Sequence, residues 1–184
     1  MTEMPKTSET IEVGKTYPEI EIDSSLQLKQ LDVSQADYLF ELTEQDREYL
    51  SKWLPWPKYT HSSDDSKNFI ESIAEKRKNG EEYGFGIEFK GKLVGHISLM
   101  HLKGEKEPEI GYWIASNSAG NGLTTKSVIA LTQFGLNTLG LKKIIIRAHP
   151  DNIGSNKVAE KAGYKYGYQG EDEDGPLNIW ELTK

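Results

Sequence analysis

Residues 117–164 decide the fold of this chain, and they open with a glycine loop, Asn117-Ser118-Ala119-Gly120-Asn121-Gly122. The loop is followed in turn by a helix-like run from Leu123 to Leu139, an apolar run from Lys142 to Arg147, Asp151-Asn152-Ile153-Gly154-Ser155 and Ala162-Gly163-Tyr164. A predicted strand, Glu109–Ala115, precedes the loop. Glycines let the backbone approach a ligand closely, and they turn consecutive N–H groups outward at the helix N-terminus. The segment therefore predicts a site for an anion such as a pyrophosphate.

These residues resemble the GNAT superfamily of acyl-CoA-dependent N-acetyltransferases, in particular its ribosomal-protein N-terminal (Rim-type) branch. The superfamily carries Gln/Arg-x-x-Gly-x-Gly/Ala at a strand-to-helix junction, and the branch adds Asp-Asn-x-x-Ser and Gly-Phe/Tyr further on. The matching residues are Gly120, Gly122, Thr125, Asp151, Asn152, Ser155, Gly163 and Tyr164. The resemblance extends from about Leu26 to Leu182. It implies an α/β GNAT fold, in which helices flank a mixed, mostly antiparallel twisted sheet.

Length and composition set broader bounds. A chain of 184 residues suits one domain, and we expect a GNAT domain over residues 21–184 behind a mobile leader at 1–20. Its zero cysteines exclude a disulfide framework, a cysteine nucleophile and a cysteine-based zinc site. No apolar run approaches the ~18 residues of a membrane span, so we expect a cytoplasmic protein without membrane contact.

The charge balance is acidic. The sequence has 22 basic and 29 acidic residues, a net charge of −7. Such a surface repels phosphate backbones, which argues against direct nucleic-acid binding. An acidic surface could favour a cationic amine substrate, although ordinary solubility explains the same number.

Periodicity predicts further elements around the glycine loop. Apolar and polar residues alternate over 26–31, as in a half-buried strand, and Asp32 or Ser34 could cap the next helix. Residues 50–59 contain two prolines and predict a loop or broken helix. Residues 62–79 predict a helix with Phe69, Ile70 and Ile73 on one face. Lys90-Gly91 predicts a hairpin between strands 83–89 and 92–100.

Two features follow the loop. Gly135 costs about 1 kcal/mol against alanine in a helix interior, which argues against an unbroken helix over 123–139. Ile144, Ile145 and Ile146 form a continuous β-branched run, which predicts a strand buried on both faces.

The resemblance implies how acetyl-CoA is held. In the family, the strand before the glycine loop pairs with the pantetheine arm through its backbone. The side chains of Tyr112 and Trp113 are then more simply explained by core packing. Asn152 matches the asparagine that binds the pantetheine arm, with helix N-capping as the alternative. The implied cofactor-binding residues are Tyr112, Trp113, Ile114, Asn117, Gly120, Asn121, Gly122, Leu123, Thr124, Thr125, Asn152 and Ser155.

Ser155 matches a serine that lies beside the thioester sulfur as a candidate acid, and the alternative is a helix serine without a catalytic role. Two positions depart from the family. Asn117 stands where Gln or Arg is usual, which weakens a side-chain clamp on the pyrophosphate but leaves the N–H groups. Ala159 stands where many members carry a tyrosine acid. That role is therefore empty, or it passes to Ser155 or to another tyrosine such as Tyr164.

The resemblance implies Glu109 as the general base, because it opens the strand before the loop, where several members of the superfamily place a catalytic glutamate. The alternatives are that Glu109 is merely solvated, or that Glu173 or Asp174 acts through a water molecule. The four histidines share no metal-ligand spacing, so no metal is expected, and each is most simply a packing or surface residue. Among them His149, just before Pro150-Asp151-Asn152, is the one to test.

Trp53 and Trp56 lie in Tyr49-Leu50-Ser51-Lys52-Trp53-Leu54-Pro55-Trp56, which resembles the segment that walls the acceptor pocket in ribosomal-protein acetyltransferases. The alternative is a small hydrophobic core beneath a loop. We therefore expect acetyl-CoA as co-substrate and a protein N-terminal amine, such as that of a ribosomal protein, as acceptor. The alternatives are a small amine (polyamine, amino acid or antibiotic) and an acyl-CoA-binding module without turnover. Oligomeric state is left open, with a homodimer among the alternatives.

Overall fold

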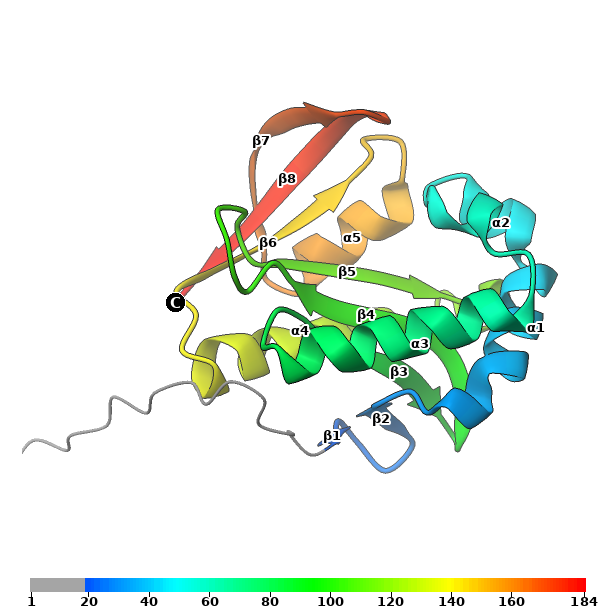
Figure 1. The fold of residues 1–184 in the computed structure, drawn as a ribbon. Helices are drawn as coiled ribbons and strands as arrows, with labels where there is room; N and C mark the ends of the chain where they lie inside the picture. Colours follow the sequence, from blue (N-terminus) through cyan, green and yellow to red (C-terminus); the bar gives the residue numbers. More distant parts are fainter. Residues whose placement is uncertain (1–18) are drawn as a thin grey trace, which may run out of the picture.

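The computed structural model describes residues 19–184, and these form one eight-stranded sheet with helices on both faces (Figure 1). The leader expected over residues 1–20 lies outside the described residues except at its last two positions. The strands are β1 (Ile20–Glu21), β2 (Leu26–Lys29), β3 (Tyr83–Phe89), β4 (Lys92–Met100), β5 (Glu109–Ile114), β6 (Lys143–Ala148), β7 (Lys165–Asp172) and β8 (Gly175–Thr183). The helices are α1 (Ala36–Gln45), α2 (Arg47–Ser51), α3 (Ser63–Lys78), α4 (Leu123–Gln133) and α5 (Ile153–Lys161). Short helices η1 (Val33–Gln35), η2 (Trp56–Tyr59), η3 (Ser116–Ser118) and η4 (Phe134–Thr138) complete the described part.

The sheet order is β1-β2-β3-β4-β5-β6-β8-β7, and every neighbouring pair is antiparallel except β5 and β6. This confirms the mixed, mostly antiparallel sheet. The register of the parallel pair contains only Glu109 opposite Ile145. The two strands therefore separate beyond that point, and the second half of β5 is not paired to β6.

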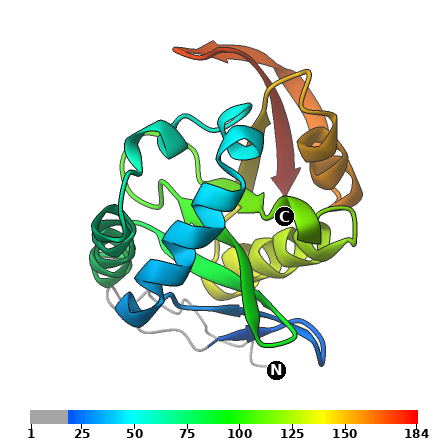
Figure 2. The same cartoon turned by 90° about the vertical axis from the view of Figure 1, so that its right-hand side faces the viewer.

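Side chains of β5 alternate between two cores, because successive residues of a strand point to opposite faces. Ile110 packs with Val128 and Leu131 of α4. Trp113 packs on the opposite face with α1 and α3. Figure 2 shows α3 on one side of the sheet and α4 with α5 on the other. β5 is thus the strand that both layers of helices share.

Several local predictions are confirmed. Lys90 and Gly91 both have positive φ, 50° and 76°, as a tight hairpin turn requires. The helix predicted over residues 62–79 is α3, with Ser62 as its N-cap. Residues 47–59 form the short helices α2 and η2 separated by a break, as the prolines indicate.

The predicted interruption at Gly135 is confirmed, because α4 ends at Gln133 and a π-helical turn follows over residues 134–138. A Cβ atom on Gly135 would lie 2.7 Å from Cδ1 of Ile144. The glycine therefore lets this turn pack closely on β6. On the predicted face of α3, Ile70 and Ile73 are buried, whereas Phe69 is 38% exposed and packs against His96.

Candidate active site

The glycine loop has the backbone that its sequence indicates. Gly120 and Gly122 have φ of 79° and 74°, in the left-handed region that favours glycine. A Cβ atom at either position would meet nothing within 4 Å. Gly122 is the N-cap of α4, so the first N–H groups of that helix point toward open space with no intrahelical partner. These N–H groups are of the kind that bind anions at helix N-termini.

A cavity of about 300 Å³, here called the loop cavity, lies between this loop, β5, α2 and α5. It is lined by most of the residues expected to hold the cofactor: Tyr112, Trp113, Ile114, Gly120, Gly122, Leu123, Thr124, Thr125, Asn152 and Ser155. Asn117 and Asn121 do not line it, and Trp53, expected in the acceptor wall, does. The only charged side chains among its described lining residues are Lys157 and Lys161, both on α5. The loop cavity is therefore positively charged, a feature that sequence reasoning missed.

Ser155 and Tyr112 are brought together inside the loop cavity. The hydroxyl of Tyr112 lies 3.0 Å from the Ser155 Oγ and 3.0 Å from the Ser155 carbonyl oxygen. Burial raises the pKa of Tyr112 to about 12, so this hydroxyl stays protonated near neutral pH. The assignment of the Tyr112 side chain to core packing therefore missed a polar contact, whereas Trp113 is buried in the core as expected.

Asn152 caps α5, and its side-chain oxygen accepts a hydrogen bond from the backbone N–H of Ser155 at 3.2 Å. The capping alternative is therefore confirmed, and the same residue also lines the loop cavity. The cap fixes the first turn of α5, and with it the position of Ser155.

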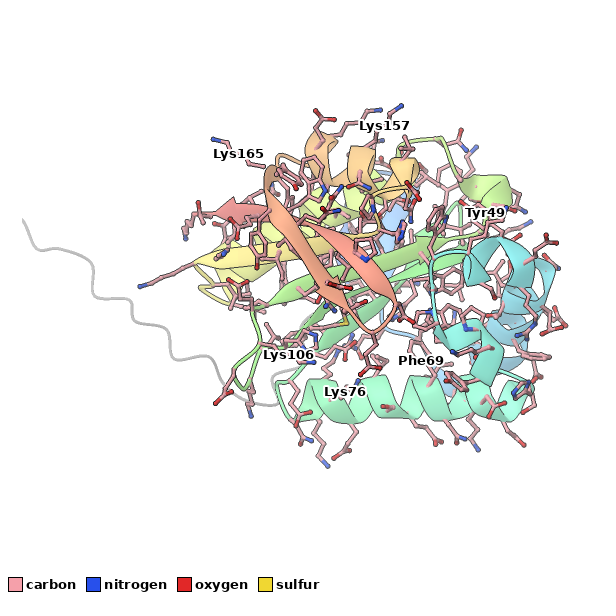
Figure 3. All side chains as sticks on the ribbon, turned by 90° about the horizontal axis from the view of Figure 1, so that it is seen from above. Tyr49, Phe69, Lys76, Lys106, Lys157 and Lys165 are labelled. Carbon is pink, nitrogen blue, oxygen red and sulfur yellow. The ribbon has the colours of Figure 1, made fainter. Side chains whose placement is uncertain are left out.

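A second cavity of about 600 Å³ lies on the other face of β5, against α1 and α3. Five aromatic side chains line this aromatic cavity: Trp56, Tyr59, Phe69, Tyr112 and Trp113. Both cavities are lined by Leu54, Tyr112 and Trp113, so they meet at β5. Figure 3 shows Tyr49 and Lys157, from the loop cavity, on one side of the sheet and Phe69 on the side of α3.

One end of the aromatic cavity is polar. Ser98 donates a hydrogen bond to Oε1 of Glu82 at 2.6 Å, and Lys76 reaches Oε2 of the same carboxylate at 3.0 Å. Burial lowers the pKa of His96 to about 4, so the imidazole is neutral at pH 7. Its Nε2 is buried and has no hydrogen-bond partner among the described residues.

Sequence reasoning missed this polar end and treated His96 as a packing or surface residue. A signal was present, because His96 and Ser98 stand two apart in an otherwise apolar strand. Two polar residues with that spacing share one face of a strand. Glu82 lies just before β3 and carries no signal of its own.

The structure does not bring the other candidates to the cavities. Glu109 accepts a hydrogen bond from Nε of Arg147 at 2.9 Å and lines neither cavity. Glu173 and Asp174 are exposed in the turn between β7 and β8. The hydroxyl of Tyr164 lies 2.8 Å from that of Thr132.

His149 lines neither cavity, and its ring lies 5.6 Å from that of Trp53. Over residues 19–184 no cluster of three or more histidine or carboxylate side chains is placed to hold a metal ion. In the same range no helix has the length and apolar character to cross a bilayer.

Comparison with known proteins shows the family. The acetyltransferase (GNAT) domain matches residues 25–165. The ribosomal-protein-serine acetyltransferase of Escherichia coli (strain K12) is 26% identical over 146 residues, which cover 79% of this chain and 82% of that protein. A putative ribosomal N-acetyltransferase of Bacillus subtilis (strain 168) is 31% identical over 149 residues, with coverages of 78% and 79%. A solved structure of the microcin C7 self-immunity acetyltransferase, in complex with acetyl-CoA and AMP, is 25% identical with a TM-score of 0.85, covering 94% of this chain and 100% of that one.

The chain therefore belongs to the GNAT acetyltransferase family, and its sheet and flanking helices are the GNAT fold. It is an N-acetyltransferase whose co-substrate is acetyl-CoA. Family membership confirms the enzymatic interpretation over that of a binding module without turnover.

Proposed function

We propose that acetyl-CoA binds in the loop cavity, that the acceptor amine binds in the aromatic cavity, and that the two react beside Tyr112 and Trp113. The observation that supports this most is the meeting of the two cavities at β5. Lys157 and Lys161 give the loop cavity the charge that the phosphates of CoA require. The N–H groups after Gly122 would receive the pyrophosphate.

The reaction proceeds by direct attack in a ternary complex. The amine nitrogen attacks the thioester carbonyl carbon, the carbon–sulfur bond breaks, and the leaving thiolate takes a proton. Ser155, held by Asn152 and Tyr112, donates that proton in this proposal and regains one from water, which takes up the proton lost by the attacking amine. Holding amine and thioester together lowers the barrier by several kcal/mol without a covalent enzyme intermediate.

Deprotonation of the acceptor is a separate question, because an ammonium group cannot attack. Glu109 is the sequence candidate, and its ion pair with Arg147 outside both cavities means that it could act only through intervening water. We expect Glu109→Gln to lower stability, through loss of the ion pair, and to keep the acidic limb of the kcat–pH profile. A flattened acidic limb would instead establish Glu109 as the base.

We propose a protein N-terminal amine, such as that of a ribosomal protein, as the acceptor. Two relatives are named as ribosomal acetyltransferases, and this motivates the choice. Such a role belongs in the cytoplasm. A small amine is the second candidate, since the similar structure of the microcin C7 self-immunity acetyltransferase holds a small molecule, AMP, together with acetyl-CoA. A homodimer is the alternative to a monomer, and sedimentation distinguishes them.

The test is an assay of the purified protein with acetyl-CoA that follows release of free thiol. The acceptors are peptides with free N-termini, matched peptides with blocked N-termini, polyamines and aminoglycosides. We expect turnover with the free peptides and none with the matched blocked peptides, with the acetyl group located on the N-terminal nitrogen by mass spectrometry. Turnover with a polyamine or aminoglycoside, and none with peptides, would replace the proposed acceptor by a small amine.

A further inference from the structure

The charged side chains that line the aromatic cavity are acidic, the reverse of those in the loop cavity. Its described lining residues include two carboxylates, Asp65 and Glu82, and no lysine or arginine. His96 adds no positive charge, because burial keeps the imidazole neutral at pH 7. Asp65 is engaged in capping α3, where it accepts hydrogen bonds from the backbone N–H groups of His61 and Ser62 at 2.8 and 3.1 Å. Glu82 is therefore the carboxylate with capacity for a ligand.

The Glu82 carboxylate is fixed in place. The residue is 6% exposed, and each of its oxygens has one partner, Ser98 or Lys76. A carboxylate offers about four acceptor positions, so two remain for a ligand. Lys76 belongs to α3, does not line the cavity and is 45% exposed, so water screens its charge. Figure 3 shows Lys76 on α3, which also carries Phe69.

The walls of the cavity suit a cation with an apolar body. The rings of Trp56 and Trp113 lie 5.6 Å apart, centroid to centroid, and Phe69 packs edge-on against His96 at 5.1 Å. Aromatic faces attract ammonium groups and also cover apolar surface. Glu82 and His96 also line this cavity. The Glu82 carboxylate can accept further hydrogen bonds from a ligand, and the buried Nε2 of His96 has no hydrogen-bond partner among the described residues.

We propose that Glu82 makes the aromatic cavity selective for acceptors that carry an ammonium group with no anionic group beside it. This inference rests on the proposed function and narrows its acceptor class. The α-ammonium of a peptide is followed by an uncharged amide and fits. The same ammonium in a free amino acid is followed by a carboxylate, which Glu82 would repel inside a cavity of low dielectric. Free amino acids are thus disfavoured, and peptide N-termini and simple primary amines are favoured.

The test compares L-phenylalaninamide with L-phenylalanine, which differ only in the group beside the ammonium. With the wild-type protein, acetyl-CoA and correction for the free-amine fraction, we expect kcat/KM to favour the amide by about tenfold or more. Glu82→Gln should reduce this preference by about tenfold, mainly through the acceptor KM. The preference of the wild type is compared with that of Glu82→Gln for the same two acceptors. Differences in acceptor ionisation in solution therefore cancel in this comparison.

The matched control is Glu81→Gln, because Glu81 is the exposed neighbour of Glu82 and lines neither cavity. It should keep the wild-type preference. If Glu82→Gln does not fold, Ser98→Ala removes one partner of the carboxylate and should change the same ratio. Calorimetry with CoA should give the wild-type affinity in every folded variant.

Equal use of both acceptors by the wild type, or an unchanged preference in Glu82→Gln, would overturn the inference while the proposed acetyl transfer stands. If CoA binds and neither acceptor nor any free peptide is acetylated, the proposed acceptor site itself is wrong. A protein that acetylates long peptides and neither phenylalanine derivative would overturn the proposal of a compact site that binds a cation.

Discussion

Tyr112→Phe should separate the catalytic role of Ser155 from a purely structural one. The change removes one hydroxyl and keeps the ring, so the packing of β5 on α5 is retained. Both hydrogen bonds of that hydroxyl go to Ser155, at 3.0 Å to Oγ and 3.0 Å to the carbonyl oxygen. The carbonyl oxygen can only accept, so the single Tyr112 hydrogen has two acceptors in Ser155, the carbonyl oxygen and Oγ. In the transition state we expect that hydrogen to go to Oγ, which frees the Ser155 hydrogen to point at the thioester sulfur. In Tyr112→Phe, Ser155 loses the contact that favours this orientation of its hydroxyl hydrogen.

The magnitude follows from the bond that is lost. A hydrogen bond between neutral groups contributes about 0.5–1.5 kcal/mol. If that amount is lost only in the transition state, kcat falls by about two- to thirteenfold. The KM for acetyl-CoA should stay near the wild-type value, because the backbone of β5 is unchanged. Since burial raises the pKa of Tyr112 to about 12, the effect should not vary between pH 6 and pH 9.

The assay is thiol release under steady-state conditions, run as a double-mutant cycle with Ser155→Ala. In the Ser155→Ala background, Tyr112→Phe should lower kcat less than it does alone. Tyr164→Phe is the matched control, because its hydroxyl is also buried and bonds Thr132 at 2.8 Å outside the loop cavity. Additive effects of Tyr112→Phe and Ser155→Ala would refute the proposal that Tyr112 acts by orienting the Ser155 hydroxyl. An equal loss of kcat in Tyr164→Phe would refute it as well.

Three further changes test the loop, the helix break and the buried imidazole. Gly122→Val should weaken CoA binding by about tenfold or more in calorimetry, because a β-branched side chain would stand where phosphate meets backbone, at a φ of 74° that costs about 1–2 kcal/mol. Gly135→Ala should lower the Tm, because a Cβ atom 2.7 Å from Cδ1 of Ile144 costs about 1–3 kcal/mol and outweighs the gain of about 1 kcal/mol in helix propensity. As pH falls from 6.5 toward 4, unfolded His96 takes up a proton that the folded state excludes, since burial lowers the folded pKa to about 4. The free energy of unfolding should therefore fall by about 3 kcal/mol over that range.

Each of these has a control in the chain. Gly104→Val also places valine at a positive φ, 97°, with open space around the Cβ atom, and should leave CoA affinity unchanged. Gly154→Ala, whose Cβ atom would be 3.9 Å from its nearest neighbour, should not lower the Tm. His96→Gln should lose the fall in stability below pH 6.5. A loss of affinity in Gly104→Val, a higher Tm for Gly135→Ala, or the same acid sensitivity in His96→Gln would each contradict the reasoning.

The sequence determined the features that depend on local backbone chemistry. Lys90-Gly91 predicted the hairpin, and Gly120 with Gly122 predicted the loop, because glycine adopts positive φ values far more readily than other residues. The β-branched run at 144–146 predicted a strand buried on both faces, and the structure buries all three residues. The glycine loop, the Asp-Asn-x-x-Ser motif at 151–155 and the distance between them together predicted the GNAT family. Each of these features depends on residues that lie close together in the sequence, so a single sequence is enough to predict it.

Tertiary structure alone decided which side chains meet. Tyr112 and Ser155 are 43 positions apart, and the separation of β5 from β6 together with the capping of α5 by Asn152 sets their contact. Glu82 and Ser98 meet because β3 and β4 pair in one particular register. Glu109 accepts a hydrogen bond from Arg147 because β5 pairs with β6 at Glu109 and Ile145, two residues from Arg147. Such contacts depend on strand register and on the crossing of distant elements, neither of which leaves a periodic trace in the chain.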